Sequence, residues 1–317
     1  MKYFIALDSS GSKTDSILFD QTGNVLARDY CKGANAFDVG PAEAISRICA
    51  TIDRLAEAIP EGGKLKGVFG SVSVISFYPE IQEKVSRHLG TVPCQLDSIV
   101  SSVMNAVLGK EDGVCIISGT GAYCCIREQG QPLRYLGGSG YLLDTGGSGF
   151  ELGRQALIAA ERDVDGRGVK TVLTQLIQED VGESVIDHLP VIYEGGRPYI
   201  AAFAPHVFTA CAQRDAVATE IFNKGVNCFV ESLHTAYAML GHPFKVAVGG
   251  GIFLHHPAYV KAIAQRAPQG CELILLNTPA VYGNALEAMW QNNEEIAPDF
   301  RNNFLQSYAQ FPTPKLI

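Results

Sequence analysis

The chain has 317 residues, of which 47% are hydrophobic and 18% charged, and its formal net charge at pH 7 is −8. This length and composition predict a well-packed globular protein with enough chain for two domains. The basic residues form no cluster, so we expect neither a nucleic acid nor an anionic membrane surface as a partner.

The first third of the chain predicts a sheet that begins with a meander. Three β-like runs joined by short turns cover residues 3–7, 16–19 and 25–30. Helices and strands then alternate. The helices are predicted over residues 41–59, 79–89 and 99–108, and the strands over residues 66–74 and 92–96. This order predicts an α/β fold, with a mixed sheet and helices on its faces.

The rest of the chain opens in the same way and then becomes mainly helical. Three β-like runs, at residues 114–118, 123–127 and 133–136, precede a glycine-rich segment at residues 137–154. So many glycines predict turns that need positive φ or a close backbone approach. Further helices are predicted over residues 150–162, 169–181, 200–213, 217–240, 259–267 and 280–290, with strands over 245–248 and 273–276. The polar last residues, 291–317, are expected to pack back on the protein or to be partly disordered.

The first predicted strand leads into the run DSSGSKT at residues 8–14. Small residues after a buried strand let backbone N–H groups close on an anion, so this run predicts a phosphate loop. Asp8 would hold Mg²⁺ directly or through water, and Lys13 would add a positive charge near the phosphates. The residues expected to contact the phosphates are Gly11, Ser12, Lys13 and Thr14. Taken alone, the run is more commonly an ordinary hairpin turn.

A second copy of this unit favours the phosphate loop over the turn. A shift of 108 residues lays the run SGS at residues 10–12 on the run SGT at residues 118–120. Two matching units about a domain's length apart predict two lobes that face each other across a cleft, with both loops aimed at one polyphosphate. We place the lobes at residues 1–109 and 110–317. The second loop adds Gly119, Thr120 and Gly121 to the residues expected to bind the polyphosphate.

Several motifs, in order along nearly the whole chain, resemble those of the sugar-kinase, actin and Hsp70-like ATPases. DSSGSKT resembles the first phosphate motif, ISGTGA the second, and VGGGIF the adenosine motif. The segments GGSGYLLDTGGSGFELGRQAL, DVDGRG and AAFAPHVF are similar to the N-acetylglucosamine kinase branch of the BadF/BadG/BcrA/BcrD ATPase family. Ser9 and Ser10 replace glycines of the first motif, which requires that neither residue has a positive φ.

This resemblance implies a fold and a reaction. The fold is the two-lobed actin-like ATPase fold, also called ribonuclease H-like, with duplicated mixed-sheet domains and an interlobe cleft. The reaction is phosphorylation of a sugar hydroxyl by ATP with Mg²⁺. The implied acceptor is a small amino sugar: N-acetylglucosamine, or a relative such as N-acetylmuramic acid or glucosamine. The resemblance leaves a homodimer open.

The resemblance also implies residue roles. Asp97 matches the catalytic base, which accepts the proton of the sugar hydroxyl as its oxygen attacks the γ-phosphorus. An Asp at that position is also a common N-cap for the following helix. Asn35 matches a sugar-binding Asn, although a loop Asn is most often a turn former. Gly249, Gly250 and Gly251 match the adenosine motif; the alternative is a turn at a strand end.

The glycine-rich segment departs from the branch where the sugar is expected. Gly138, Ser139, Asp144 and Thr145 take the positions of the sugar pocket, and Ser139 stands where the branch usually has Trp. Thr145 and Gly146 replace an Asp and a Glu of the branch, and Asp144 lies one position before the missing Asp. The loss of an acidic residue would suit an acceptor that carries its own carboxylate, such as N-acetylmuramic acid.

Two other functions stay open. One is an ATPase that activates an acyl-CoA dehydratase or reductase and carries an iron–sulfur cluster on cysteines. The nine cysteines here lie mostly in apolar runs without C-x-x-C spacing, which is typical of reduced core cysteines in the cytoplasm. No apolar run has the length of a signal peptide or a membrane span, which also indicates a cytoplasmic protein. The other function is a non-catalytic sugar or nucleotide sensor, which the changed sugar loop suggests. The presence of Asp8, Lys13 and Asp97 favours the kinase.

Overall fold

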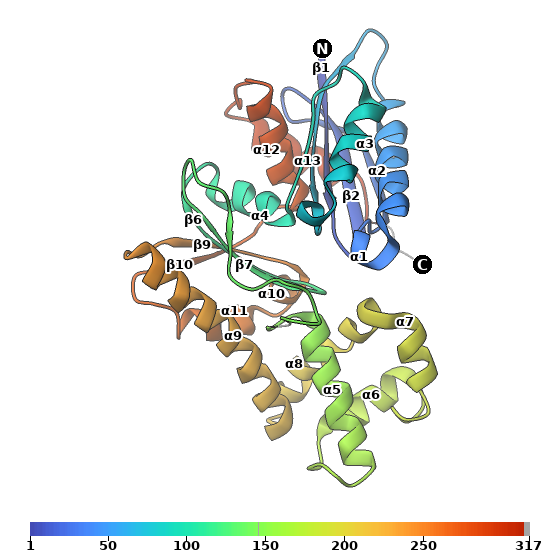
Figure 1. The fold of residues 1–317 in the computed structure, drawn as a ribbon, viewed down its shortest axis with the longest axis vertical. Helices are drawn as coiled ribbons and strands as arrows, with labels where there is room; N and C mark the ends of the chain where they lie inside the picture. The colour runs from blue at the N-terminus through green and yellow to red at the C-terminus, as the bar shows by residue number, and fades with distance from the viewer. Residues whose placement is uncertain (145, 314–317) are drawn as a thin grey trace. The chain divides into compact units, whose positions relative to one another are not determined.

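The computed structural model describes residues 1–144 and 146–313 and divides the chain into two compact units (Figure 1). Unit 1 consists of Met1–Lys110 together with the chain from Leu276 onward, and unit 2 consists of Glu111–Leu275. The predicted boundary between residues 109 and 110 lies beside this division.

The prediction that the second lobe continues to residue 317 is wrong. Helix α12 (Val281–Gln291) packs on strand β1 (Lys2–Ser9) and on helix α4 (Ile99–Leu108), all within unit 1. Helix α13 (Phe300–Tyr308) follows it and buries Phe300 and Phe304 in the same core. The described part of the polar last segment, residues 291–313, therefore packs back on the protein, as one of the two alternatives predicted, and residues 314–317 lie outside the described residues.

Unit 1 is built on a five-stranded mixed sheet with the strand order β3-β2-β1-β4-β5. The strands are β1 (Lys2–Ser9), β2 (Lys13–Asp20), β3 (Val25–Lys32), β4 (Lys64–Val72) and β5 (Cys94–Asp97). β1, β2 and β3 form the predicted antiparallel meander, and β4 and β5 run parallel to β1. The carboxyl ends of β1, β4 and β5 therefore lie at one edge of the sheet.

Helices cover both faces of this sheet. They are α1 (Ala36–Val39), α2 (Pro41–Ala56), α3 (Pro79–Leu89), α4, α12 and α13, with a short 3-10 helix at Ile75–Phe77. Ile5 and Leu7 of β1 pack in one core with residues of α2 and α3, whereas Phe4 and Ala6 pack in another core with α12 and α13. Because side chains alternate along a strand, β1 is apolar on both faces, as its unbroken hydrophobic run predicts.

Unit 2 repeats the same sheet. Its strand order is β10-β9-β6-β7-β8, in which β6, β7 and β8 form an antiparallel meander and β9 and β10 run parallel to β6. The strands are β6 (Gly113–Ser118), β7 (Ala122–Arg127), β8 (Arg134–Tyr135), β9 (Lys245–Gly249) and β10 (Glu272–Leu275). In both units the meander is followed by two parallel strands on the side of its first strand, so the predicted duplication is confirmed at the level of topology.

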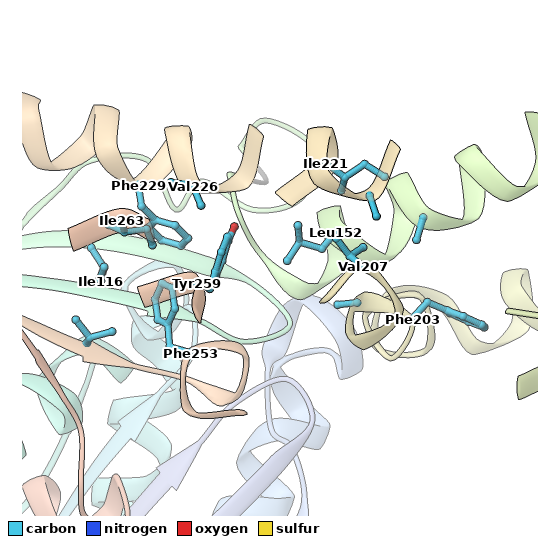
Figure 2. Packing of buried hydrophobic residues seen from close by; sticks show 14 of the residues in the cluster. Ile116, Leu152, Phe203, Val207, Ile221, Val226, Phe229, Phe253, Tyr259 and Ile263 are labelled. Atoms are coloured by element: carbon cyan, nitrogen blue, oxygen red, sulfur yellow. The ribbon is translucent and has the colours of Figure 1, made fainter. Parts of the chain in front are cut away.

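The helices of unit 2 form most of its core. They are α5 (Gly149–Val164), α6 (Val172–Val181), α7 (Leu189–Ala201), α8 (Ala204–Ala212), α9 (Ala216–Leu240), α10 (Gly251–His255) and α11 (Pro257–Ala264). Figure 2 shows Phe229, Phe253 and Tyr259 close together in this core, and Leu152, from α5, near Val207. The core therefore joins the sheet to the helical block that separates β8 from β9.

Three helices of the described chain are missing from the prediction in addition to α13. Helices α1 and α10 are short, and α7 contains Gly195, Gly196 and Pro198, which disguise its helical pattern. At Gly196, with φ of 58°, two helical segments join across a kink. No helix of the described residues is long and apolar enough to cross a membrane.

Candidate active site

Asp8 lies near the end of β1 and is buried, with 5% of its surface exposed. Ser71 Oγ on β4 donates a hydrogen bond to its Oδ1 at 2.8 Å, and Ser102 Oγ on α4 lies 3.3 Å from the same oxygen. Oδ2 accepts no hydrogen bond from a described residue. Burial raises the pKa of Asp8 above its usual range, and nearby Lys13 opposes this effect. A cation beside Oδ2 would stabilise the carboxylate in this setting.

The predicted first phosphate loop is the tight turn between β1 and β2. The N–H of Ser10 donates to the carbonyl of Lys13 at 2.8 Å, and the Ser10 hydroxyl donates to the same oxygen at 3.1 Å. Ser9 and Ser10 both have negative φ, so they satisfy the condition for replacing glycine in this motif. Gly11, Ser12 and Lys13 form the accessible part of the turn, and Ser12 is exposed.

Thr14 is turned away from solvent. Its side chain is buried, and its hydroxyl hydrogen bonds with Ser9 Oγ at 2.8 Å and with the carbonyl of Lys32 at 3.2 Å. These bonds tie the turn to β3. The predicted contact of Thr14 with ATP stays a prediction, and in the structure its hydroxyl supports the turn.

Asp97 is the last residue of β5. Its Oδ1 accepts a hydrogen bond from the N–H of Ser98 at 2.6 Å, and its Oδ2 accepts one from Ser101 Oγ at 2.9 Å. The N-cap of α4 is Ser98, whose hydroxyl accepts from Val100 N–H, so the alternative that Asp97 itself caps this helix is wrong. The carboxylate is half-buried and held at the end of the strand.

Asn35 is buried at the N-cap of α1. Its Oδ1 accepts a hydrogen bond from the N–H of Phe37 at 2.9 Å, as a turn-forming Asn does. Its amide Nδ2 donates to no described residue. Asn35 therefore has a structural role, and its amide hydrogens are available for the sugar contact that the sequence predicts.

The predicted second phosphate loop joins β6 to β7 in unit 2. Gly119 N–H donates to the carbonyl of Gly121 at 2.9 Å. The start of α5 docks on the loop, because Gly149 N–H donates to Gly119 O at 2.7 Å and Phe150 N–H donates to Thr120 O at 3.2 Å. A Cβ at Gly119 would meet nothing within 4 Å, so this glycine leaves its backbone open to the surroundings.

The predicted adenosine motif lies beside this loop. Gly249 ends β9 and is the register neighbour of Ile117 on β6. Gly250 has φ of 98°, and a Cβ there would lie 2.4 Å from the carbonyl oxygen of Ser118, so this position requires glycine. Gly251 begins α10, and a Cβ there would meet nothing within 4 Å. The motif is therefore one obligatory turn glycine followed by one glycine with open space.

The predicted sugar loop is organised by Asp144. Asp144 Oδ2 accepts a hydrogen bond from the N–H of Gly138 at 2.5 Å, and Oδ1 accepts one from Gly146 N–H at 3.2 Å. The Asp144 carboxylate thus closes the loop on itself. Ser139 is exposed, and Thr145 lies outside the described residues.

Gly138 and Asp144 line a cavity of about 350 Å³ in unit 2. Tyr123 of β7 and Cys228, Glu231 and Thr235 of α9 also line it. The structure thus brings two of the predicted sugar residues together, with a second carboxylate, Glu231, on the wall of the same cavity.

The donor groups of unit 1 suit a Mg²⁺ ion that is shared with phosphate and water better than they suit a metal ion whose ligands all come from the protein. Mg²⁺ in phosphoryl-transfer sites is usually held by one or two carboxylates, with water and phosphate oxygens as the other ligands. Asp8 offers one buried carboxylate with an open oxygen, and the described residues contain no cluster of three or more His, Cys, Asp or Glu that could hold a metal ion. All nine cysteines are free and at least half-buried, and burial raises the pKa of Cys94 to about 11 and that of Cys124 to about 12.

The sequence prediction missed three residues around Asp8. Ser71 and Ser102 contact its carboxylate, and Asn284 Nδ2 on α12 donates to Ser71 Oγ at 2.8 Å and to the carbonyl of Leu7 at 2.7 Å. These side chains come from distant parts of the sequence and belong to no short motif. Only the glycine-and-serine break in the predicted strand at residues 66–74 marks one of them in the sequence.

Comparison with known sequences gives one family and two relatives. The profile of the BadF/BadG/BcrA/BcrD ATPase family matches residues 5–288. An N-acetylmuramic acid/N-acetylglucosamine kinase of Clostridium acetobutylicum is 28% identical over 271 residues, which cover 80% of this chain and 86% of the relative. An N-acetyl-D-glucosamine kinase of Dictyostelium discoideum is 30% identical over 190 residues, which cover 56% of this chain and 59% of the relative.

Solved structures agree on the fold. A Chromobacterium violaceum protein, named provisionally as an N-acetylglucosamine kinase, aligns with a TM-score of 0.70 at 19% identity, over 91% of this chain and 99% of its own. A glucokinase of Streptomyces griseus in complex with glucose and AMPPNP aligns with a TM-score of 0.58 at 16% identity, over 91% and 98%. The fold class predicted from the sequence, the α/β fold of the sugar kinases with duplicated mixed sheets, is confirmed.

Proposed function

Because the chain belongs to the BadF/BadG/BcrA/BcrD ATPase family, we propose that it transfers the γ-phosphoryl group of ATP to a hydroxyl of an N-acetylated amino sugar. The observation that supports this most is the placement of Asp8 and Asp97. Both lie at the carboxyl ends of parallel strands, the edge at which α/β sheets bind ligands, and Asp8 adjoins the turn that resembles a phosphate motif. The two relatives named as amino-sugar kinases support the same reaction class.

In this proposal the chain's own groups position the reactants. Asp97 accepts the proton of the sugar hydroxyl, while the hydroxyl oxygen forms a bond to the γ-phosphorus and the bond to ADP breaks. Ser98 and Ser101 hold the Asp97 carboxylate through one hydrogen bond to each oxygen. Asp8 would hold Mg²⁺, which when bound neutralises phosphate charge. Lys13 and the turn at Gly11 and Ser12 would contact the phosphates. The contacts of ATP with Gly119–Gly121 and Gly249–Gly251 stay predictions.

The charge of the sugar loop indicates which kind of sugar is the acceptor. Asp144 does not replace the lost acidic residues of the branch in a simple way, because both of its oxygens bind backbone N–H groups of the loop itself. With Gly146 in place of the Glu, the loop has one negative charge fewer than the branch, which favours an acceptor with its own carboxylate. We therefore propose N-acetylmuramic acid together with N-acetylglucosamine as acceptors, the pair named for the Clostridium acetobutylicum relative.

A coupled ADP-release assay tests this function. The purified chain with ATP and Mg²⁺ is given N-acetylglucosamine, N-acetylmuramic acid, glucosamine, N-acetylmannosamine, glucose or no sugar. We expect turnover well above the no-sugar rate with the two proposed acceptors. If no sugar raises ADP release above the no-sugar rate while ATP still binds, the chain is not a kinase of these sugars, and a nucleotide-binding sensor becomes the better explanation.

A further inference from the structure

Asn284 is fully buried on α12, far in sequence from every residue that the motifs single out. Its Nδ2 lies 2.7 Å from the carbonyl of Leu7 and 2.8 Å from Ser71 Oγ. The carbonyl of Leu7 only accepts hydrogen bonds, so the nearby atom must be the amide nitrogen, and the orientation of the side chain follows. Both amide hydrogens are therefore used, one on the carbonyl of the residue before Asp8 and one on the hydroxyl that contacts the Asp8 carboxylate.

The other end of the same side chain has no partner. Asn284 Oδ1 is buried and accepts no hydrogen bond from any described residue. A buried polar atom without a partner is destabilising, so a residue chosen for stability alone would avoid it. The amide hydrogens must supply the reason for an Asn at this position. They act on Leu7, which precedes Asp8, and on Ser71, which contacts the Asp8 carboxylate.

The direction of the hydrogen bonds at Ser71 can be assigned. Ser71 has one hydroxyl hydrogen, and because Asn284 donates to Ser71 Oγ, the hydroxyl is free to donate to Asp8 Oδ1 at 2.8 Å. Ser102 is a weaker partner of this oxygen, since its hydroxyl also lies 2.8 Å from the carbonyl of Ile99 but 3.3 Å from Asp8. Ser71 therefore contributes most to fixing Oδ1, which leaves Oδ2 open.

Helix α12, which carries Asn284, packs closely against α4, and this contact fixes the position of Asn284. The neighbouring Gly283 lies against α4, and a Cβ at Gly283 would come within 1.9 Å of the carbonyl oxygen of Ser102. Only glycine allows α12 to approach α4 so closely. Helix α12 thus connects to the Asp8 carboxylate of β1 through two side chains in series, Asn284 and Ser71.

We propose that Asn284 and Ser71 are positioning residues that orient the Asp8 carboxylate for Mg²⁺. This inference rests on the proposed function, because it assigns Asp8 to the metal of an ATP complex. The hydrogen bonds from Asn284 Nδ2 to Ser71 Oγ and from Ser71 Oγ to Asp8 Oδ1 restrict the rotation of the carboxylate, so Oδ2 would be held ready for the metal without a reorganisation cost. Partners of metal-binding carboxylates of this kind typically change metal affinity by about 10–100-fold when they are removed.

Titration calorimetry with a non-hydrolysable ATP analogue, with and without Mg²⁺, tests the proposal. The quantity compared is the gain in analogue affinity that Mg²⁺ produces. In Ser71→Ala and Asn284→Leu, we expect this gain to fall by about tenfold or more, while affinity without Mg²⁺ stays close to that of the wild type. The matched control is Ser16→Ala, a fully buried serine of β2 whose hydroxyl has no partner among the described residues.

The outcomes separate this inference from the proposed function. If the wild type and Ser16→Ala bind the analogue more tightly with Mg²⁺ and Ser71→Ala shows the same gain, Ser71 and Asn284 do not position Asp8 and the proposal is overturned. If the wild type itself does not bind the analogue, the proposed function fails. Should Asn284→Leu not fold, Ser71→Ala alone decides, because it removes only one oxygen atom.

Discussion

Asp8 and Asp97 lie at one level of the sheet in unit 1, each the register partner of Ser71 on the strand between them. Register neighbours on parallel strands point to the same face, so both carboxylates project to one side at the strands' carboxyl ends. Their surroundings differ: Asp8 is buried among serine hydroxyls, whereas Asp97 is half-buried at a helix start. This difference suits two roles, one as a metal ligand and the other as a base.

Asp97→Asn is expected to remove turnover and to leave nucleotide binding intact. The amide cannot accept the proton of the sugar hydroxyl, and loss of a general base typically costs about 10²–10⁴-fold in rate. The measurement is kcat in the ADP-release assay together with nucleotide affinity by calorimetry. Ser101→Ala is the control, because it removes one hydrogen bond to Asp97 but keeps the carboxylate. A variant that retains nearly the full rate would show that Asp97 is not the base.

Gly250→Ala and Gly251→Ala are expected to differ sharply. Alanine at position 250 would adopt φ of 98° and press against the Ser118 carbonyl, so we expect a loss of stability of about 1–3 kcal/mol or more. Alanine at position 251 meets nothing within 4 Å, so the protein should fold normally. If the nucleotide lies against bare backbone there, Gly251→Ala binds ATP more weakly at unchanged Tm. Wild-type affinity in Gly251→Ala would remove this glycine from the nucleotide site.

The sequence predicts the strands of the two sheets better than it predicts the helices around them. The meanders, the parallel strands and the duplicated loops follow from local patterns, since unbroken apolar runs and small turns are contiguous in the chain. Helix α7 was not predicted because Gly196 and Pro198 interrupt its periodicity, and α13 was not predicted because only Phe300 and Phe304 form its buried face. Tertiary packing stabilises such segments, and no local propensity reveals it.

The residues of the candidate site also fall into those that the sequence predicts and those that it does not. The motifs place Asp8, Asp97 and the glycine loops at strand ends, and the structure puts each of these there. The partners of Asp8 could not be predicted, because Ser71 and Asn284 reach it only through strand register and helix packing. The role of Asp144 was not apparent either, since its hydrogen bonds to Gly138 and Gly146 depend on the conformation of the glycine-rich loop.

Acid is expected to destabilise unit 2 through Asp163 of α5. Its buried carboxylate lies 2.8 Å from Lys170 Nζ and accepts a hydrogen bond from Thr174 Oγ1 at 2.7 Å. Lys170 first, and then Thr174, lower its pKa from 3.8 to about 2. A carboxyl whose pKa is lowered in the folded state stabilises the fold above its unfolded value, and this stability is lost as the pH falls from about 4 towards 2.

Urea unfolding between pH 5 and pH 3, followed by circular dichroism, measures this effect. We expect the free energy of unfolding of the wild type to fall with pH more steeply than that of Asp163→Asn, which has no carboxyl to protonate. Lys170→Met should give an intermediate slope. It removes the largest cause of the lowered Asp163 pKa, a side chain that is 91% exposed, but leaves the hydrogen bond from Thr174 in place. Equal slopes in the wild type and Asp163→Asn would show that this carboxyl does not contribute.

Phe304→Ala is expected to destabilise unit 1 although it lies near the C-terminus. Phe304 is fully buried, 4.9 Å from the Tyr282 ring centroid and 5.7 Å from that of Tyr308, in the core that also holds Phe4. Removing a buried Phe side chain typically costs about 3–5 kcal/mol. Arg301→Ala in the same helix is the matched control, because its side chain is exposed and such changes usually stay within about 0.5 kcal/mol.

The single tryptophan makes this test specific to unit 1. Trp290 lies on α12 and packs against the same core, so its fluorescence reports unfolding of that unit alone. We expect the urea midpoint of this signal to drop in Phe304→Ala and to stay at the wild-type value in Arg301→Ala. Equal midpoints in the two variants would mean that α13 does not stabilise the sheet of Asp8 and Asp97. A lower midpoint in Phe304→Ala would make the end of the chain part of the scaffold that holds both carboxylates.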